Sequence, residues 1–200
     1  MAKYNRNQII PIIIILTIIV AAVFMLVSLA RILFFADPTI NTPVSSDSSQ
    51  QALLDKSAGR EVKMTVRGPI VASEDFRHYT IDITPSTRIL MVYKGYDDQQ
   101  IDTIGLSNDP SAYEQFVYAL NKAKFMDGTA LIGDGNDTRG VCATGELYDF
   151  QILSSNKIIK EVWTTSCSSA KGSLGTSLTP IIDLFWEQVP GIDSKVNDLW

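Results

Sequence analysis

One uninterrupted apolar segment near the amino terminus constrains this chain more than any other feature. Residues 9–30 read IIPIIIILTIIVAAVFMLVSLA without a charged side chain, and after Arg31 the run ILFFA extends the segment to Ala36. About 20 apolar residues in a helix cross the ~30 Å hydrocarbon core of a bilayer. Residues 9–36 are therefore predicted to form a single transmembrane helix, with membrane lipid as its partner.

The flanks of this segment predict its orientation. Lys3 and Arg6 precede it, whereas Arg31 is the only cation close to its far end. Positively charged flanks stay in the cytoplasm. Residues 1–8 are thus expected to be cytoplasmic and residues 37–200 extracytoplasmic, in a single-pass protein of the cell membrane. A removable signal peptide is the alternative, but its apolar core would span only about 7 to 15 residues, so we favour an uncleaved signal anchor.

The chain then passes through a polar stretch. Residues 37–60 are dominated by Ser, Thr, Pro, Asp and Gln and contain few large apolar side chains. Such a composition buries too little surface to fold, which predicts a flexible linker with at most a brief helical turn at residues 52–54. An extracytoplasmic α+β domain is predicted for residues 61–200.

The domain assignment follows from the hydrophobic pattern. Six short stretches rich in β-branched and aromatic residues are predicted as strands: 61–66, 78–84, 88–96, 99–106, 147–153 and 158–164. Two helices are expected, over residues 111–125 after the cap Asn108-Asp109-Pro110 and over residues 181–189 after Thr179-Pro180. This order predicts a mostly antiparallel sheet with two helices on one face.

The chain has 2 cysteines, Cys142 and Cys167, and they frame the last predicted hairpin. With a turn centred between Ser154 and Ser155, the two cysteines would face each other if pairing continued past the strands. Facing Cβ atoms lie about 4.5 to 5.5 Å apart, near the range of a disulfide. A disulfide is therefore predicted, and it agrees with an oxidising, extracytoplasmic location. Two unpaired buried cysteines are the alternative.

Residues that could carry chemistry do not assemble into a recognised motif. His78 is the single histidine, and no nucleophile lies in a G-x-S-x-G turn, so a Ser-His-Asp mechanism is not expected. Residues 133–140 are rich in the oxygen ligands of calcium. The EF-hand spacing fails, however, because Arg139 occupies the glycine position and Gly145 the glutamate position. No catalytic, cofactor-binding or metal site is assigned, and no cofactor is expected.

Carboxylates cluster at residues 74–75 and 97–98 and at Asp102, and a suitably spaced pair could hydrolyse a polysaccharide. Acidic turns that keep a domain soluble explain them more simply. The three tryptophans are interpreted as packing residues rather than ligand platforms, with Trp200 the most exposed.

Charge restricts the class of partner. Lys3, Arg6 and Arg31 are the only charged residues before Asp37, so of 17 Lys and Arg and 22 Asp and Glu, residues 37–200 hold 14 cations and all 22 anions. Nucleic acid is a poor partner for such a surface. The predicted function is a binding or assembly role toward a protein partner in the envelope or outside it. An envelope hydrolase, or a subunit of a larger membrane complex, is the alternative.

Overall fold

The computed structural model describes Val20 and residues 46–129 and 131–200. The chain divides into two units, Met1–Pro43 and Val44–Trp200, and the second unit is the folded domain considered below. The predicted cytoplasmic terminus (1–8), the predicted span (9–36) and the first part of the predicted linker lie outside the described residues, apart from Val20. Within the described ranges, no helix has the length and apolar character needed to cross a bilayer.

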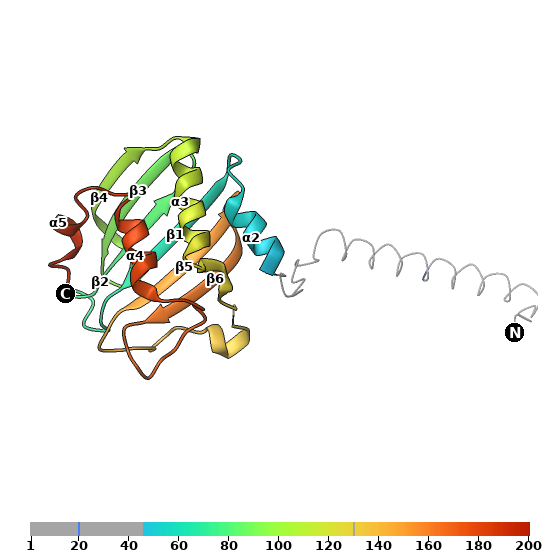
Figure 1. Ribbon diagram of the computed structural model, residues 1–200. Coiled ribbons are helices and arrows are strands. Elements are labelled where there is room, and N and C mark those ends of the chain that lie inside the picture. Colours follow the sequence, from blue (N-terminus) through green and yellow to red (C-terminus); the bar gives the residue numbers. More distant parts are fainter. Residues whose placement is uncertain (1–19, 21–45, 130) are drawn as a thin grey trace, which may run out of the picture. The chain divides into compact units, whose positions relative to one another are not determined.

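Six antiparallel strands form one sheet in the order β4-β3-β2-β1-β5-β6 (Figure 1). Their bounds are β1 Arg60–Arg67, β2 Arg77–Ile83, β3 Thr87–Lys94, β4 Gln99–Ser107, β5 Leu147–Ser154 and β6 Lys157–Thr165. Each strand lies within a few residues of its predicted range. The predicted α+β class and antiparallel sheet are confirmed.

Three helices lie over one face of this sheet (Figure 1). They are α2 Ser46–Leu54, α3 Pro110–Lys122 and α4 Leu178–Trp186. The short elements are η1 Phe125–Asp127, η2 Gly133–Asn136 and α5 Asp193–Val196. The two predicted helices correspond to α3 and α4. The carboxylate of Asp109 caps α3 by accepting hydrogen bonds from the amides of Ser111 and Ala112, at 2.9 and 3.0 Å.

Helix α2 lies where the sequence predicts a flexible linker. Leu53 is fully buried in the core, and Asp55 accepts a hydrogen bond of 2.6 Å from Arg60, the first residue of β1. Residues 46–60 therefore belong to the folded domain. The average composition of the segment conceals this, because two small or apolar side chains, Ala52 and Leu53, are enough to dock a short helix on a core formed by other elements.

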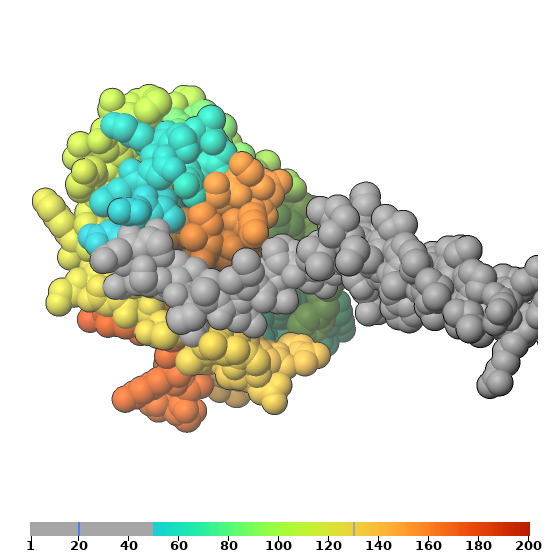
Figure 2. Space-filling view, turned by 90° about the vertical axis from the view of Figure 1, so that its right-hand side faces the viewer, coloured from blue at the N-terminus to red at the C-terminus, as the bar shows by residue number. Residues whose placement is uncertain are grey.

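The core lies between the helices and one face of the sheet. Val62, Met64 and Val66 alternate along β1 with half-buried polar residues, so one face of the central strand is apolar. On the helix side, Phe185 of α4 is fully buried and its ring meets that of Phe116 edge-on, with centroids 5.3 Å apart. Helix α2 contacts β6, and the two lie side by side in Figure 2.

The register of the last hairpin differs from the predicted one. Ser154 faces Lys157, which leaves Ser155 and Asn156 as a two-residue turn with φ of 49° and 64°. Two positive φ values are the mark of a type I′ turn, which matches the twist of the flanking strands. The predicted centre between Ser154 and Ser155 is therefore wrong. A bulge between Ile152 and Leu153 shifts the pairing by one further residue.

The predicted disulfide between Cys142 and Cys167 is present, with Cα atoms 5.6 Å apart. It does not arise from cross-strand pairing, because Leu147 faces Thr165 and a straight continuation would place Cys142 opposite Ala170. The segment before β5 turns instead, with Cys142 at φ 51°. Gly145 makes this possible, since a Cβ there would lie 2.8 Å from the Cys142 sulfur.

Candidate functional site

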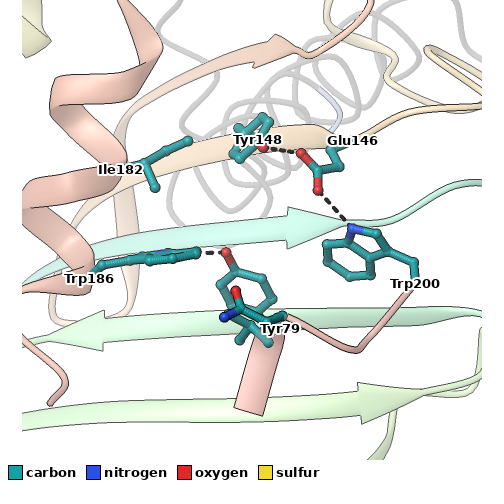
Figure 3. Close-up of a pocket in the computed structure, with 8 residues that line it drawn as sticks. Tyr79, Glu146, Tyr148, Ile182, Trp186 and Trp200 are labelled. Carbon is teal, nitrogen blue, oxygen red and sulfur yellow. Dashed lines mark hydrogen bonds between the residues drawn. The ribbon is translucent and has the colours of Figure 1, made fainter. Parts of the chain in front are cut away.

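A cavity of about 290 Å³ opens between one end of the sheet, helix α4 and the segment that follows α5 (Figure 3). Figure 3 labels six lining side chains around one space: Tyr79, Glu146, Tyr148, Ile182, Trp186 and Trp200. Val196 and Asn197 complete the lining. Four of these eight residues are large aromatics, so the wall is built mainly of rings.

Two tyrosines come from the sheet. Val66 of β1 pairs with Tyr79 of β2 on one side and with Tyr148 of β5 on the other. All three side chains are buried and lie on the helix-covered face. Because neighbouring strands are about 4.8 Å apart, the two tyrosines stand roughly two strand spacings apart, on either side of the smaller valine.

Helix α4 supplies the next wall. Trp186 is the last residue of this helix, and Ile182 lies one turn earlier on the same side. The indole Nε1 of Trp186 donates a hydrogen bond of 3.3 Å to the hydroxyl of Tyr79. This bond fixes the edge of the indole against the sheet.

Trp200 closes the opposite side. Its ring is nearly parallel to that of Tyr79, with centroids 6.2 Å apart, and 46% of the residue is exposed. The indole lies against the backbone of Gly68, just after β1, where a Cβ would come within 2.6 Å of its Cε3 atom. The predicted exposure of Trp200 is confirmed, and this residue also forms part of the cavity wall.

Glu146 provides the one charged side chain in the lining. Its Oε1 accepts a 2.7 Å hydrogen bond from Trp200 Nε1, and its Oε2 accepts one from the Tyr148 hydroxyl. Among the described residues no Lys, Arg or His forms an ion pair with this carboxylate. A carboxylate offers about four lone-pair sites, so two remain available.

The backbone of Glu146 is held from the disulfide side. Its amide donates to the Ser166 hydroxyl at 2.8 Å, and its carbonyl accepts from the Ser166 amide at 3.0 Å. Ser166 is the neighbour of Cys167, which is bonded to Cys142. The disulfide thus anchors the short segment that carries the charged side chain of the cavity.

Burial determines the protonation of the two tyrosines. It raises the pKa of Tyr79 and of Tyr148 above the ordinary value, and in Tyr148 the hydrogen bond to Glu146 raises the pKa further. Both phenols therefore remain neutral at physiological pH. The cavity presents neutral aromatic rings beside the negatively charged side chain of Glu146.

The residues that the sequence suggested as candidates for chemistry lie outside this cavity. The ring of His78 stacks on Tyr93 with centroids 4.7 Å apart, and its Nε2 is 3.4 Å from Asp98. Burial lowers the pKa of His78. Asp102 pairs with Lys195 at 2.7 Å, and residues 74–75 are exposed in the connection between β1 and β2. The structure brings none of these groups into the cavity.

The loop at residues 133–140 has its own internal partners. Arg139 donates to both carboxylate oxygens of Asp137 and holds the pKa of that carboxyl at about 2. In the part of the chain that the structure describes, no group of three or more His, Cys, Asp or Glu side chains is placed to hold a metal ion.

Two other carboxylates have raised pKa values, and sequence reasoning did not single them out. Burial raises the pKa of Asp82 to about 6 and that of Asp149 to about 7. Both alternate with core residues along their strands and so lie on the sheet face away from the helices. Lys63 lies 3.3 Å from Asp82. They belong to the polar face of the sheet and not to the cavity.

Sequence reasoning also missed the cavity itself. Alternation places Tyr79 and Tyr148 on the buried phase of their strands, but only the strand order brings them to either side of β1. No protein-family model matches the chain, and no curated protein is significantly similar to it.

Proposed function

We propose that this chain is a single-pass, membrane-anchored protein whose extracytoplasmic domain binds a partner in the cell envelope through the cavity between Trp186 and Trp200. The apolar run at residues 9–36, with Lys3 and Arg6 before it, supports the anchor and its orientation. The disulfide supports an oxidising compartment, since such bonds are rare in the cytosol.

The composition of the cavity wall carries the binding role. Aromatic walls with a few polar groups are typical of sites that bind and orient a ligand. An acid–base glycosidase needs two carboxyl groups about 5 to 9.5 Å apart across the scissile bond. Glu146 has the only side-chain carboxylate among the residues that line this cavity. The geometry therefore favours binding over the alternative of an envelope hydrolase.

Site-specific photocrosslinking in native membranes tests this function. A photoreactive residue at Asn197, an exposed position in the lining, is expected to capture the partner. The same residue at Tyr118, an exposed position of α3 outside the lining, serves as the matched control. Capture at position 197 should disappear with Trp186→Leu. Equal capture at both positions, or capture that survives Trp186→Leu, would contradict the proposal.

A second experiment separates this role from that of a complex subunit held by its span. Replacing residues 9–36 with an unrelated transmembrane sequence should leave the capture at position 197 intact. Loss of capture would favour the subunit alternative. A reporter fused after Trp200 should be active only outside the cytoplasm, and activity inside would reverse the proposed topology.

A further inference from the structure

The carboxylate of Glu146 is a negative charge in an aromatic setting, and within residues 46–129 and 131–200 it forms no ion pair with a cation. Its two recorded partners, the Trp200 indole and the Tyr148 hydroxyl, are neutral donors. Neutral hydrogen bonds orient the carboxylate but do not cancel its charge. The cavity therefore has a negative potential that a positively charged ligand would neutralise.

The rings around this charge select the kind of cation. The faces of Trp and Tyr rings carry negative potential and attract cations within about 6 Å, most strongly where water is excluded. Tyr79, Tyr148, Trp186 and Trp200 surround one space (Figure 3). An alkylated ammonium is weakly hydrated and makes apolar contact on every side, so it fits rings better than a strongly hydrated primary ammonium, which requires several acceptors.

Hydrogen-bond capacity points the same way. Each carboxylate oxygen of Glu146 already accepts one bond, and the Tyr79 hydroxyl already accepts one from Trp186. The two lone-pair sites that remain on the carboxylate are fewer than the three N–H donors of a primary ammonium. A quaternary ammonium needs none of them. The volume of about 290 Å³ lies at the lower end of ligand pockets, which suits a headgroup-sized cation.

We infer that this cavity binds a quaternary (fully alkylated) ammonium group. Glu146 would supply the counter-charge, and the four aromatic side chains would form the walls. The inference rests on the proposed binding function and names the chemistry of its ligand. Free alkylammonium compounds and the headgroups of larger molecules share this chemistry.

Nuclear magnetic resonance of the three indole groups provides the test. The full chain is held in a maltoside detergent, which has no ammonium headgroup, and is titrated with tetramethylammonium at constant ionic strength. The Nε1–H signals of Trp186 and Trp200 should shift and saturate. Trp163, which is buried in β6 outside the cavity, is the internal reference and should not move.

Two comparison ligands determine which chemical class of ligand the cavity prefers. Tert-butanol has a similar shape without the charge, and methylammonium has the charge without the methyl groups around it. Tetramethylammonium should bind about tenfold more tightly than either. Equal binding of tert-butanol would mean a plain apolar cavity, and preference for methylammonium would mean a site for primary amines. Either result overturns the inference.

Two variants test whether the negative charge of Glu146 contributes to tetramethylammonium binding. Glu146→Gln keeps an acceptor for Trp200 but removes the charge, and should weaken tetramethylammonium binding about tenfold. Glu114→Gln removes a carboxylate of α3 outside the lining and should change nothing. Unchanged affinity in Glu146→Gln would overturn the inference. Choline and a choline-headgroup lipid then distinguish a free ligand from a headgroup.

The outcome is separable from that of the proposed function. If tetramethylammonium does not bind although photocapture at Asn197 still depends on Trp186, the cation chemistry is wrong and the binding role stands. If neither is seen, the binding role fails as well.

Discussion

The two edges of the sheet are completed in different ways. At the β6 edge, an irregular segment lies directly against the strand: the Trp163 amide donates to the Ser173 hydroxyl at 3.0 Å, and the Leu174 amide donates to the Trp163 carbonyl at 3.0 Å. Gly172 approaches so closely that a Cβ there would lie 1.9 Å from that carbonyl oxygen. Backbone groups that an edge strand leaves unpaired are here satisfied by the chain itself.

The β4 edge is open by comparison. Ile101 is 48% exposed, and a Cβ on Gly105 would meet nothing within 4 Å. The amide of Thr103 donates a hydrogen bond of 2.8 Å to the side chain of its neighbour Asp102. The comparison shows that a short irregular segment can protect an edge when glycine permits close approach. It also predicts that the same kind of substitution lowers the stability of the domain more at the β6 edge than at the β4 edge.

The largest effect is expected from a matched pair of glycine substitutions. Gly172→Ala forces a methyl group into the Trp163 carbonyl and should lower the free energy of unfolding by at least about 3 kcal/mol. Gly105→Ala, on the open edge, should be neutral or stabilise by up to about 0.5 kcal/mol, since alanine restricts the unfolded chain. Urea unfolding of both variants measures the contrast. Similar losses at the two positions would remove the difference between the edges.

Removal of the disulfide should have the second-largest effect on stability. Cys167 begins the segment that covers β6, so Cys142→Ser with Cys167→Ser should lower stability by about 3 kcal/mol and loosen this edge. Hydrogen exchange should accelerate at the amides of Trp163 and Leu174. The amides of β4 are the internal control, and faster exchange there by the same factor would indicate global unfolding instead of loss of one edge.

Two carboxylates whose pKa values are shifted in opposite directions should give opposite pH dependences. Burial raises the pKa of Asp149, on β5 next to the covered edge, to about 7. The folded state then binds more protons than the unfolded state, so stability falls as pH rises from about 4 to about 7. Asp149→Asn should reduce this decline to the part that Asp82 causes, and should leave stability near pH 4 unchanged. A variant with the wild-type decline would show that Asp149 does not cause it.

The second carboxylate is Asp102 on β4, whose pKa is lowered chiefly by the hydrogen bond from Lys195. Its contribution is present at neutral pH and is lost as pH falls below about 4. Asp102→Asn should therefore cause a slight loss at pH 7 that vanishes in acid. An effect that grows in acid would contradict the assignment.

The smallest effect is expected at Ile101. Ile101→Lys places a charge on the open edge, where the side chain already contacts water, and should change stability by less than about 0.5 kcal/mol. Val162→Lys in the core of β6 is the matched comparison and should unfold the domain. A large loss at Ile101 would mean that the β4 edge is covered after all.

The sequence predicts local features well because they depend on neighbours in the chain. The strand alternation of residues 78–84 and the cap Asp109-Pro110 are such features, and both are confirmed. The predicted register of the last hairpin is wrong because the register depends on the φ values of Ser155 and Asn156 and on a bulge. The conformation of single residues determines both features.

Features that depend on distant segments could not be predicted. Helix α2 is stable because Leu53 meets a core built by later parts of the chain. The cavity joins residues 79, 146, 186 and 200, and no spacing in the sequence relates them. The disulfide prediction was correct although its assumed geometry was not, because the loop before β5 turns at Cys142.

Gly68 influences the position of the Trp200 ring in the cavity wall. The Trp200 ring rests where a side chain at position 68 would otherwise stand. Any larger residue there would displace the indole without touching the cavity itself. The shape of the cavity thus depends on the absence of a side chain at position 68, and a substitution there would alter it although Gly68 does not line the cavity.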